Sequence, residues 1–447
     1  MNHATLGTQA AAPTGDLLIT GLTLITEPGT VLPDSGILVR GGQIAEIGPS
    51  AVVSGRHQNL TAVDARGYIG MPGLINAHTH VAMGFFRGLG HGQDEMIERF
   101  FFPAEKSLTP ELLAPLSFSY IYAGLVAGVT CFSDHYYFSE GVAQAMERFG
   151  VRGVVGETVA DLGGAFPGRA SWDRWRRLID AWPYSSRITP SVAPHAADTC
   201  SEALLTELAT FARDRKLPLH MHLSQTRGEF QRVQQRAGCT PVEFAHRCGA
   251  LTDLTLAVHL VTSTVNDHKI LCGQGVTAGI CPASQIIYEQ LAPIADLMRA
   301  GVPIALATDA AASNDTADLL AEMRLMALLA QDRGVPEEHR SPEAILSMTT
   351  ENPARAIGLA SKIGSLAVGK AADIVFLARD LSTEPSPKLT TNVIYSHTSR
   401  NVRHVMVDGR FVLYNGKPTM VDADQLLAEY EAAVAAIHRR VDALATK

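Results

Sequence analysis

The sequence contains no stretch of eighteen uncharged apolar residues, and its N-terminus shows no basic segment followed by an apolar run. It therefore offers neither a transmembrane helix nor a secretory signal, and we expect a cytoplasmic protein without a membrane partner. Basic residues are scattered along the chain, and the formal net charge is −8. Because nucleic acids are bound by clustered positive charge, we expect no nucleic-acid partner.

Cysteine is scarce, and no two cysteines form a C-x-x-C pair. The six cysteines are Cys131, Cys200, Cys239, Cys248, Cys272 and Cys281. Their wide spacing favours reduced structural thiols over a disulfide framework or a zinc knuckle. The sequence also lacks a G-x-S-x-G motif, which excludes a hydrolase built on a serine nucleophile elbow.

The long middle of the chain alternates strand-like and helix-like segments. Eight apolar runs are strand candidates: MPGLINAHTH, VTCFSDHYY, VRGVVGETV, ITPSVAPH, LPLHMHL, LTLAVHL, GVTAGICP and VPIALATD. Amphipathic segments such as SEALLTELATFARDRK lie between them. This α/β pattern, with the strand count that a (β/α)8 TIM-type barrel needs, predicts such a barrel over residues 71–362.

Both ends of the chain have a different texture, with short β-like runs separated by Gly, Pro and Asp. They include LLITGLTLI and GILVRGGQIAEIG within residues 1–70, and ADIVFLARD and NVRHVMVDGRFVLYNG within residues 363–447. The two segments could complete one sheet-rich domain only if the chain between them leaves and returns. A last amphipathic helix is expected in ADQLLAEYEAAVAAIHRRVDALA.

Histidines and a carboxylate gather at or next to the C-terminal ends of the expected strands. They are His78, His80, His135, His195, His222, His259 and Asp309. In a closed barrel these strand ends meet at one face, which is where barrel active sites form. Several imidazoles and a carboxylate packed into one cavity must be neutralised or ligated to a metal ion.

The spacing of His78 and His80 allows both imidazoles to project to the same face of a strand and to hold one ion. A second pair ends LPLHMHL, and we assign ligation to His222, whereas His220 either takes part or packs beneath the site. Asp309 could instead cap the helix expected near Thr316, but Ser313, Asn314 or Asp315 would cap that helix better. We therefore predict one divalent transition metal ion, zinc or else iron, on His78, His80, His222 and Asp309.

Such a site has a defined chemistry. Three neutral imidazoles and one carboxylate leave an open position for water, whose pKa falls to about 7 on a zinc-like ion. Asp309 is then the available base, and His259 is the candidate for stabilising the developing charge or the leaving group. Dinuclear versions usually need a lysine on the fourth strand, but no lysine lies between Lys106 and Lys216, so we expect one ion.

Taken in order, the motifs resemble the amidohydrolase superfamily, in its branch of ATZ/TRZ-like hydrolases and nucleobase or heterocycle deaminases. The resemblance covers nearly the whole chain and rests on MPGLINAHTHVAM, FFRGLGHGQDEMIERFFFPAE, AGLVAGVTCFSDHYYF, APHAADTCS, HMHLSQTRGE, AVHL, CPAS, TDAAASNDTADLLAEMR and IGSLAVGKAADIVFL. It implies a barrel with a small β-sandwich domain built from both chain ends, residues 1–70 and 363–447. It is also compatible with a homodimer, although the sequence shows no interface.

The resemblance further implies roles for individual residues. The ligands of a mononuclear metal site match His78, His80, His222 and Asp309, and His259 lies near the hydrolytic water. His195 corresponds to a residue that reaches the substrate. The pocket for a small heterocyclic substrate is lined at the positions of Met83, Phe86, His135 and Ser313.

One position departs from the deaminase pattern. Deaminases of this branch generally read H-L-x-E-T, with a glutamate that moves protons, whereas this chain reads H-L-S-Q-T with Gln225 at that position. A carboxamide carries no titratable proton. Glu229 matches a second acidic position of the family, one helical turn away, but we do not expect it to replace the missing acid. A deliberate exchange of Glu for Gln is a further alternative.

Three hypotheses follow. The first is a hydrolase acting on carbon–nitrogen bonds other than peptide bonds, in its commonest form an aminohydrolase (deaminase) of a heterocycle that uses metal-bound hydroxide. The second keeps the same site but removes halide or opens an amide or urea, which Gln225 favours because general acid–base help is worth about 10²- to 10⁴-fold. The third is an inactive amidohydrolase-like scaffold, which the four retained ligand positions argue against.

Overall fold

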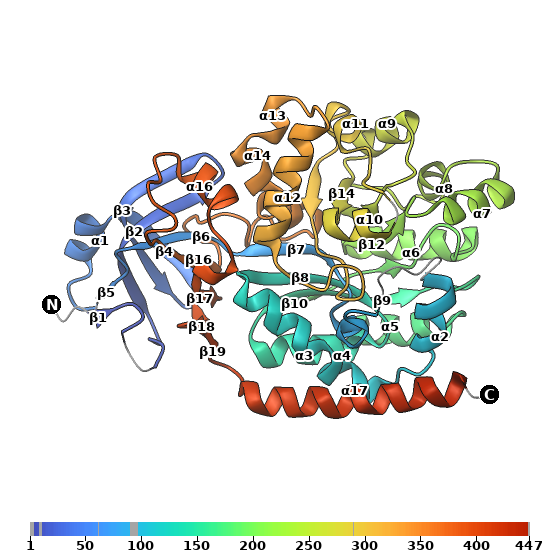
Figure 1. Ribbon diagram of the computed structural model, residues 1–447, viewed down its shortest axis with the longest axis horizontal. Helices are drawn as coiled ribbons and strands as arrows, with labels where there is room; N and C mark the ends of the chain where they lie inside the picture. The colour runs from blue at the N-terminus through green and yellow to red at the C-terminus, as the bar shows by residue number, and fades with distance from the viewer. Residues whose placement is uncertain (1–3, 9–10, 61, 90–96, 289, 446–447) are drawn as a thin grey trace.

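The computed structural model describes residues 4–8, 11–60, 62–89, 97–288 and 290–445. It contains a parallel barrel and a sheet to which both ends of the chain contribute (Figure 1). The barrel strands are β7 (Leu74–Thr79), β8 (Val129–Tyr136), β9 (Arg152–Val159), β10 (Ile188–Pro190) with β11 (Ala193–Pro194), β12 (Leu219–Leu223), β13 (Thr255–His259), β14 (Thr277–Ile280) and β15 (Ile304–Leu306). These segments match the eight expected runs, with the fourth strand interrupted between β10 and β11.

The barrel closes through short contacts between two parallel sheets. One sheet contains β7 to β11 and the other β12 to β15. Single bridges from Val192 to Leu219 and from Thr79 to Asp309 join them on both sides. Every residue of β7, β8 and β9 is buried, as expected of parallel strands covered on both faces. The expected (β/α)8 barrel is therefore confirmed.

Helices surround the barrel (Figure 1). They are η1 (Val81–Phe86), η2 (Ile97–Phe101), α2 (Phe102–Glu105), α3 (Pro110–Val126), α4 (Ser139–Phe149), α5 (Ala170–Ala181), α6 (Glu202–Arg215), α7 (Arg227–Ala237), α8 (Pro241–Arg247), α9 (Val265–Gly273), α10 (Pro282–Tyr288), α11 (Ile294–Arg299), α12 (Leu319–Asp332), α13 (Glu337–Arg340), α14 (Pro342–Ser347) and α15 (Glu351–Ala356). Helices α3 to α9, α11, α12 and α14 share one large core with the strands, which includes Trp172, Trp175 and Phe244.

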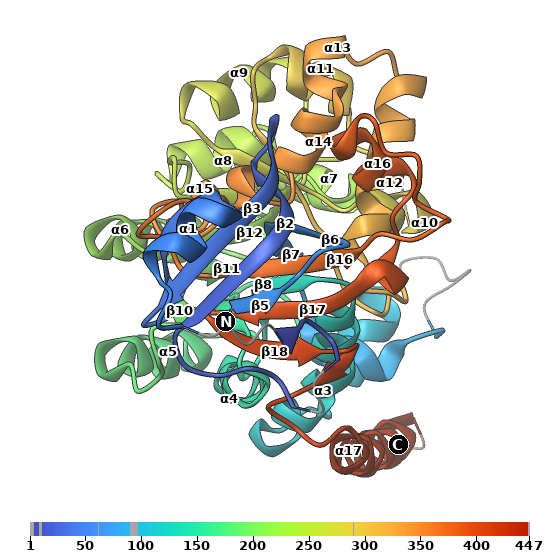
Figure 2. The same ribbon diagram turned by 90° about the vertical axis from the view of Figure 1, so that its left-hand side faces the viewer.

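Both chain ends build a single ten-stranded sheet (Figure 2). Its strands are β1 (Ala4–Thr5), β2 (Leu17–Glu27), β3 (Thr30–Arg40), β4 (Gln43–Pro49), β5 (Ala62–Asp64), β6 (Tyr68–Pro72), β16 (Ile374–Ala378), β17 (Val402–Val407), β18 (Arg410–Tyr414) and β19 (Lys417–Pro418). Antiparallel pairing of β6 with β16 joins the two ends, and β6 runs across the expected boundary at residue 70. The sheet encloses a core of its own, which includes Ile19, Ile374 and Phe376.

The remaining helices accompany the chain ends. They are α1 (Ser50–Arg56), α16 (Leu389–Tyr395), η3 (Ser399–Asn401) and α17 (Ala423–Ala445). The long helix α17 packs along α3 of the barrel (Figure 1), and Arg148 of α4 donates to Glu429 of α17 at 2.6 Å. All six cysteines are free, which agrees with the expected reduced thiols. In the part of the chain that the structure describes, no helix has both the length and the apolarity to cross a membrane.

A buried ion cluster fastens the barrel to the sheet. The guanidinium of Arg152, at the start of β9, donates from Nε to Asp373 at 2.9 Å and from Nη2 to Asp408 at 2.5 Å. The Arg152 side chain is 1% exposed and that of Asp373 is 3% exposed. Asp373 also accepts from the backbone N–H of Asp408. This single arginine therefore bridges two carboxylates of the sheet at its junction with the barrel.

We predict that Arg152→Met destabilises the protein by about 3–5 kcal/mol, because it leaves two carboxylates at the junction without their cation. Urea unfolding measures the change. The control is Arg333→Met, since Arg333 and Asp332 form an exposed pair 3.5 Å apart. This control should cost no more than about 1 kcal/mol. Equal losses in the two variants would contradict the importance of the buried cluster.

Candidate metal centre

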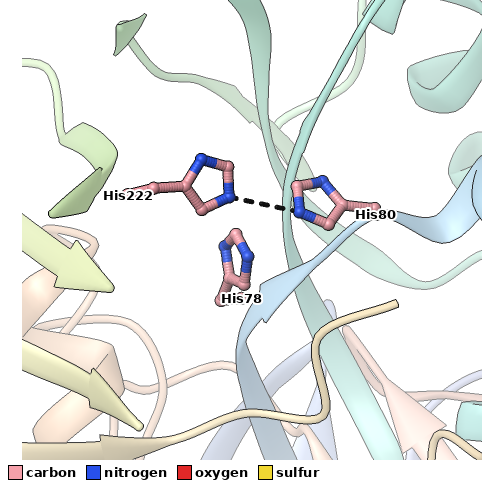
Figure 3. Close-up of side chains that lie close together, drawn as sticks. All are labelled: His78, His80 and His222. Atoms are coloured by element: carbon pink, nitrogen blue, oxygen red, sulfur yellow. Dashed lines mark hydrogen bonds between the residues drawn. The ribbon is translucent and has the colours of Figure 1, made fainter. Parts of the chain in front are cut away.

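Three histidines from two strands meet at the C-terminal mouth of the barrel (Figure 3). His78 lies on β7, His80 follows its last residue, and His222 lies on β12. Each histidine contributes one ring nitrogen to a group whose three atoms all lie within 4.8 Å of one another. Nε2 of His80 is 3.2 Å from Nε2 of His222. The structure thus brings together the three histidines that the sequence proposed as ligands.

Asp309 reaches the same place from β15. Its Oδ1 lies 3.5 Å from Nε2 of both His78 and His80, and its Oδ2 accepts a hydrogen bond of 2.6 Å from Ser284. The backbone of Asp309 has a φ of 60°. Its backbone N–H donates to the carbonyl of His78. Asp309 caps no helix: α12 is capped by Asp318, and not by the expected Ser313, Asn314 or Asp315.

His259 completes the cluster from the end of β13. Its imidazole stacks on that of His222, with ring centroids 5.5 Å apart and an interplanar angle of 15°. A nitrogen of His259, one of His78 and an oxygen of Asp309 also lie within 4.8 Å of one another. His259 has a φ of 81°, and its carbonyl accepts a hydrogen bond from Gln285. The structure therefore places His259 beside the proposed ligands.

Burial keeps these imidazoles neutral. It lowers the pKa of His78 to about 3 and that of His259 to about 4, and it also lowers the pKa of His80 and His222. Burial alone would raise the pKa of Asp309, but its contacts with His78 and the other nearby imidazoles lower it below its ordinary value. Neutral imidazoles beside an ionised carboxylate are the state in which such groups bind a cation.

The donor set fits a metal ion. Nε2 of His78 and Nε2 of His259 are buried and have no hydrogen-bond partner among the described residues. A buried polar atom without a partner costs about 1–3 kcal/mol. Because His78 clusters with the Asp309 carboxylate, a cation bound there would satisfy the lone pair of its Nε2, and His259 stands beside that position for a water or substrate atom. Nitrogen and carboxylate donors of this kind suit zinc or iron.

A cavity of about 910 Å³ opens over the cluster. Its walls include the expected residues Met83, His135, His195, Gln225 and Ser313, together with His80, His222, His259 and Asp309. Phe86 is not among the lining residues that the structure describes. It packs instead against Phe85, Phe100 and Phe101 in a separate apolar cluster, and Phe101 lines the cavity in its place.

His135 and His195, which line the cavity outside the proposed ligands, differ in the partners of their ring nitrogens. His135 has both nitrogens engaged, one by the hydroxyl of Thr158 and the other by the carbonyl of Pro194. His195 has Nδ1 2.8 Å from the hydroxyl of Thr199, and its ring contacts that of Phe102. His135 is therefore suited to shape the cavity wall, whereas His195 retains a nitrogen for a ligand.

Gln225 lines the cavity, but Glu229 does not take the place of an acid there. The carboxylate of Glu229 accepts from the backbone N–H of Ser224 at 3.1 Å and of Gln225 at 2.6 Å. Thr226 caps α7 by accepting from the N–H of Glu229, which fixes this turn further. Glu229 thus braces the segment that carries Gln225, and the expectation that it does not replace the missing acid stays a prediction.

The sequence reasoning missed a buried acid in the cavity wall. Glu105, at the end of α2, lines the cavity and accepts a hydrogen bond of 2.8 Å from the hydroxyl of Tyr136. Burial raises the pKa of Glu105 to about 7. In the sequence, Glu105 is the only acid in the run F-F-F-P-A-E and stands at its end. This run belongs to one of the motifs on which the family resemblance rests, so that position could have indicated it.

Comparison with known proteins gives a consistent picture. Residues 69–412 match the Amidohydrolase family. The chain is 32% identical over 426 residues to the 5-methylthioadenosine/S-adenosylhomocysteine deaminase of Syntrophobacter fumaroxidans, covering 92% of this chain and 95% of that protein. It is 32% identical over 434 residues to the 5'-deoxyadenosine deaminase of Methanothermobacter thermautotrophicus, covering 94% and 98%.

A solved structure is similar over the same length. The adenosine deaminase of Xanthomonas campestris with bound zinc superimposes with a TM-score of 0.88 at 27% sequence identity. The match covers 95% of this chain and 99% of that one. The similarity therefore includes the sheet formed by the chain ends as well as the barrel.

The pKa of Glu105 generates a prediction about stability. An acid whose pKa is 4.5 when unfolded and about 7 when folded binds its proton more tightly in the folded state. Its ionisation therefore destabilises the fold progressively as the pH rises from about 4.5 to 7. We expect Glu105→Gln, which can still accept from Tyr136, to gain about 1–3 kcal/mol relative to wild type between pH 4 and pH 8.

Urea unfolding of both proteins at a series of pH values measures this difference. The control is Glu202→Gln on the outer helix α6, an exposed position where the exchange should change stability little at any pH. A difference between Glu105→Gln and wild type that stays constant from pH 4 to pH 8 would show that folding does not raise the pKa of Glu105.

Proposed function

Since this chain belongs to the amidohydrolase family, we propose that it is a metal-dependent aminohydrolase that removes the exocyclic amino group of an adenosine-type nucleoside. It is a hydrolase acting on carbon–nitrogen bonds, and its relatives are deaminases of heterocyclic compounds. The observation that carries the proposal is the convergence of His78, His80, His222 and Asp309 below a cavity. These four residues would hold the ion, zinc or else iron.

The size of the cavity supports a nucleoside. A volume of about 910 Å³ lies near the upper end of the 300–1,000 Å³ typical of small-molecule sites, so it has room for more than a bare base. Met83, Phe102 and Tyr288 offer apolar and aromatic surface for a ring. Glu105 and Tyr136 offer hydrogen-bond partners for substrate hydroxyl groups. The relatives named above act on adenosine derivatives, which supports the same substrate class.

Hydrolysis replaces the amino group by an oxygen atom from water and releases ammonia. The bound ion supplies Lewis acidity, which makes water a nucleophile at neutral pH. Asp309 is ionised, and its Oδ1 faces the histidines, so it can take the proton that the attacking water loses and pass it to the departing amine. Ser284 holds the other oxygen of Asp309, and His259 can hydrogen-bond the developing charge.

Gln225 sets this chain apart within the proposal. No titratable group stands at its position, and the carboxylate of Glu229 is occupied by two backbone N–H groups. This observation favours a second candidate function at the same site, the hydrolytic removal of halide or the hydrolysis of an amide or urea. Those reactions need less protonation of the ring than deamination does.

Removal of the metal and of the proposed base tests the proposal. Zinc-loaded protein should release ammonia from adenosine, 5'-deoxyadenosine or 5'-methylthioadenosine, and removal of the metal by a chelator should abolish this activity. At a zinc content matched to wild type, Asp309→Asn should lower kcat by about 10²- to 10⁴-fold, because it removes the proton acceptor. The control is Asp318→Asn, which exchanges one good helix cap for another outside the cavity. Full activity after chelation would refute the proposal.

An acid restored at position 225 tests which reaction the site performs. If the chain is a deaminase limited by Gln225, Gln225→Glu should raise kcat/KM on adenosine derivatives by about 10²- to 10⁴-fold. Gln231→Glu, the same exchange elsewhere on the cavity lining, is the matched control and should change little. No gain in Gln225→Glu, together with wild-type activity on a chlorinated heterocycle or an amide, would instead support the second candidate function. Ammonia and chloride assays distinguish the two.

A further inference from the structure

His220 lies directly beneath the proposed metal site. It is on β12, two residues before His222, and it is 1% exposed. Its Nε2 is 2.7 Å from Nδ1 of His78, and its Nδ1 is 3.3 Å from the hydroxyl of Ser133. It is not among the residues that line the cavity. The histidine therefore contacts a proposed ligand and has no contact with the space where a substrate would bind.

The other two proposed histidine ligands are oriented differently. Nδ1 of His80 bonds the carbonyl of His135, and Nδ1 of His222 bonds the carbonyl of His195 at 2.9 Å. A carbonyl oxygen can only accept, so each of these imidazoles carries its proton on Nδ1 and has its lone pair on Nε2. His78 alone has an imidazole as its Nδ1 partner, and an imidazole nitrogen can either donate or accept.

The two hydrogen bonds that link His78 to His220 and His220 to Ser133 can therefore be arranged in two ways with the same number of protons. In the first, His78 Nδ1–H donates to His220 Nε2, and His220 Nδ1–H donates to Ser133. In the second, both hydrogen bonds run the other way, and His78 carries its proton on Nε2, 3.5 Å from Oδ1 of Asp309. Only the first arrangement leaves a lone pair on His78 Nε2 for a cation.

We propose that His220 is a positioning residue for the metal, which accepts the His78 Nδ1 proton and so fixes His78 Nε2 as a ligand atom. The inference rests on the proposed metal site and concerns how that site is held in its binding-competent form. Outer residues of this kind typically change metal affinity by 10- to 100-fold when removed. Ser133 supports His220 from the far side by accepting its Nδ1 proton.

Three variants test the role of His220 as an acceptor. His220→Leu removes the acceptor, and its zinc dissociation constant should rise about 10- to 100-fold in competition with a chromophoric chelator. His220→Gln restores an acceptor oxygen and should recover most of the affinity. Met221→Ala is the matched control, because Met221 is equally buried on the same strand but belongs to the apolar core. It should lower the melting temperature of the metal-free protein while zinc affinity stays close to wild type.

A spectroscopic measurement on unaltered protein complements the variants. In zinc-loaded protein labelled with ¹⁵N-histidine, long-range ¹H–¹⁵N correlation spectra report which ring nitrogen carries the proton. His220 should carry it on Nδ1. This test needs no variant to fold.

The outcomes separate this inference from the proposed function. Wild-type protein that binds no zinc would refute the proposed metal site itself. If wild type binds zinc, the positioning role is overturned by any of three results: unchanged affinity in His220→Leu, an equal loss in Met221→Ala, or a proton on Nε2 of His220 in the zinc-loaded protein. Loss in His220→Leu with recovery in His220→Gln supports it.

Discussion

The bridge between the first and last barrel strands is the contact on which the site depends. Thr79 and Asp309 pair at the mouth of the barrel, and the backbone N–H of Asp309 donates to the carbonyl of His78 at 3.2 Å. The same contact closes the ring of strands and brings a carboxylate to within 3.5 Å of two imidazoles. Residues more than two hundred positions apart thus become neighbours only when the barrel is complete.

Burial then decides the protonation of what this closure assembles. An isolated imidazole would be partly protonated near neutral pH, and several protonated rings within a few ångströms would repel one another. Enclosure lowers the pKa of every histidine in the cluster, and the remaining charge is the negative one on Asp309. The cavity above the cluster is also lined by Glu105, Tyr136 and Ser313, which are not needed to hold a metal ion. Their acid and hydroxyl groups fit the polar substituents of the proposed substrate.

Much of this arrangement could be predicted from sequence, because it follows from strand ends. The alternation of strands and helices predicts the barrel, and residues at the C-terminal ends of parallel strands must share one face. The same logic fails where the chain is not in a strand. Phe86 lies in a short helical turn and faces an apolar cluster, and Glu105 reaches the cavity from the end of a helix, where no strand-end rule applies. The contact of His220 with His78 depends on side-chain geometry between two strands, which a spacing of two residues does not reveal.

The pairing of β6 with β16 has a consequence for biosynthesis. Residues 68–72 pair with β2 on one side, but on the other side their partner is residues 374–378, so the N-terminal strands cannot complete their sheet until most of the polypeptide has left the ribosome. Until then the apolar face that includes Ile19 and Leu22 lacks its cover from Phe376 and Met406. Such long-range pairing slows folding and leaves nascent strands open to wrong partners. The first strands of this protein therefore wait for their cover through most of translation.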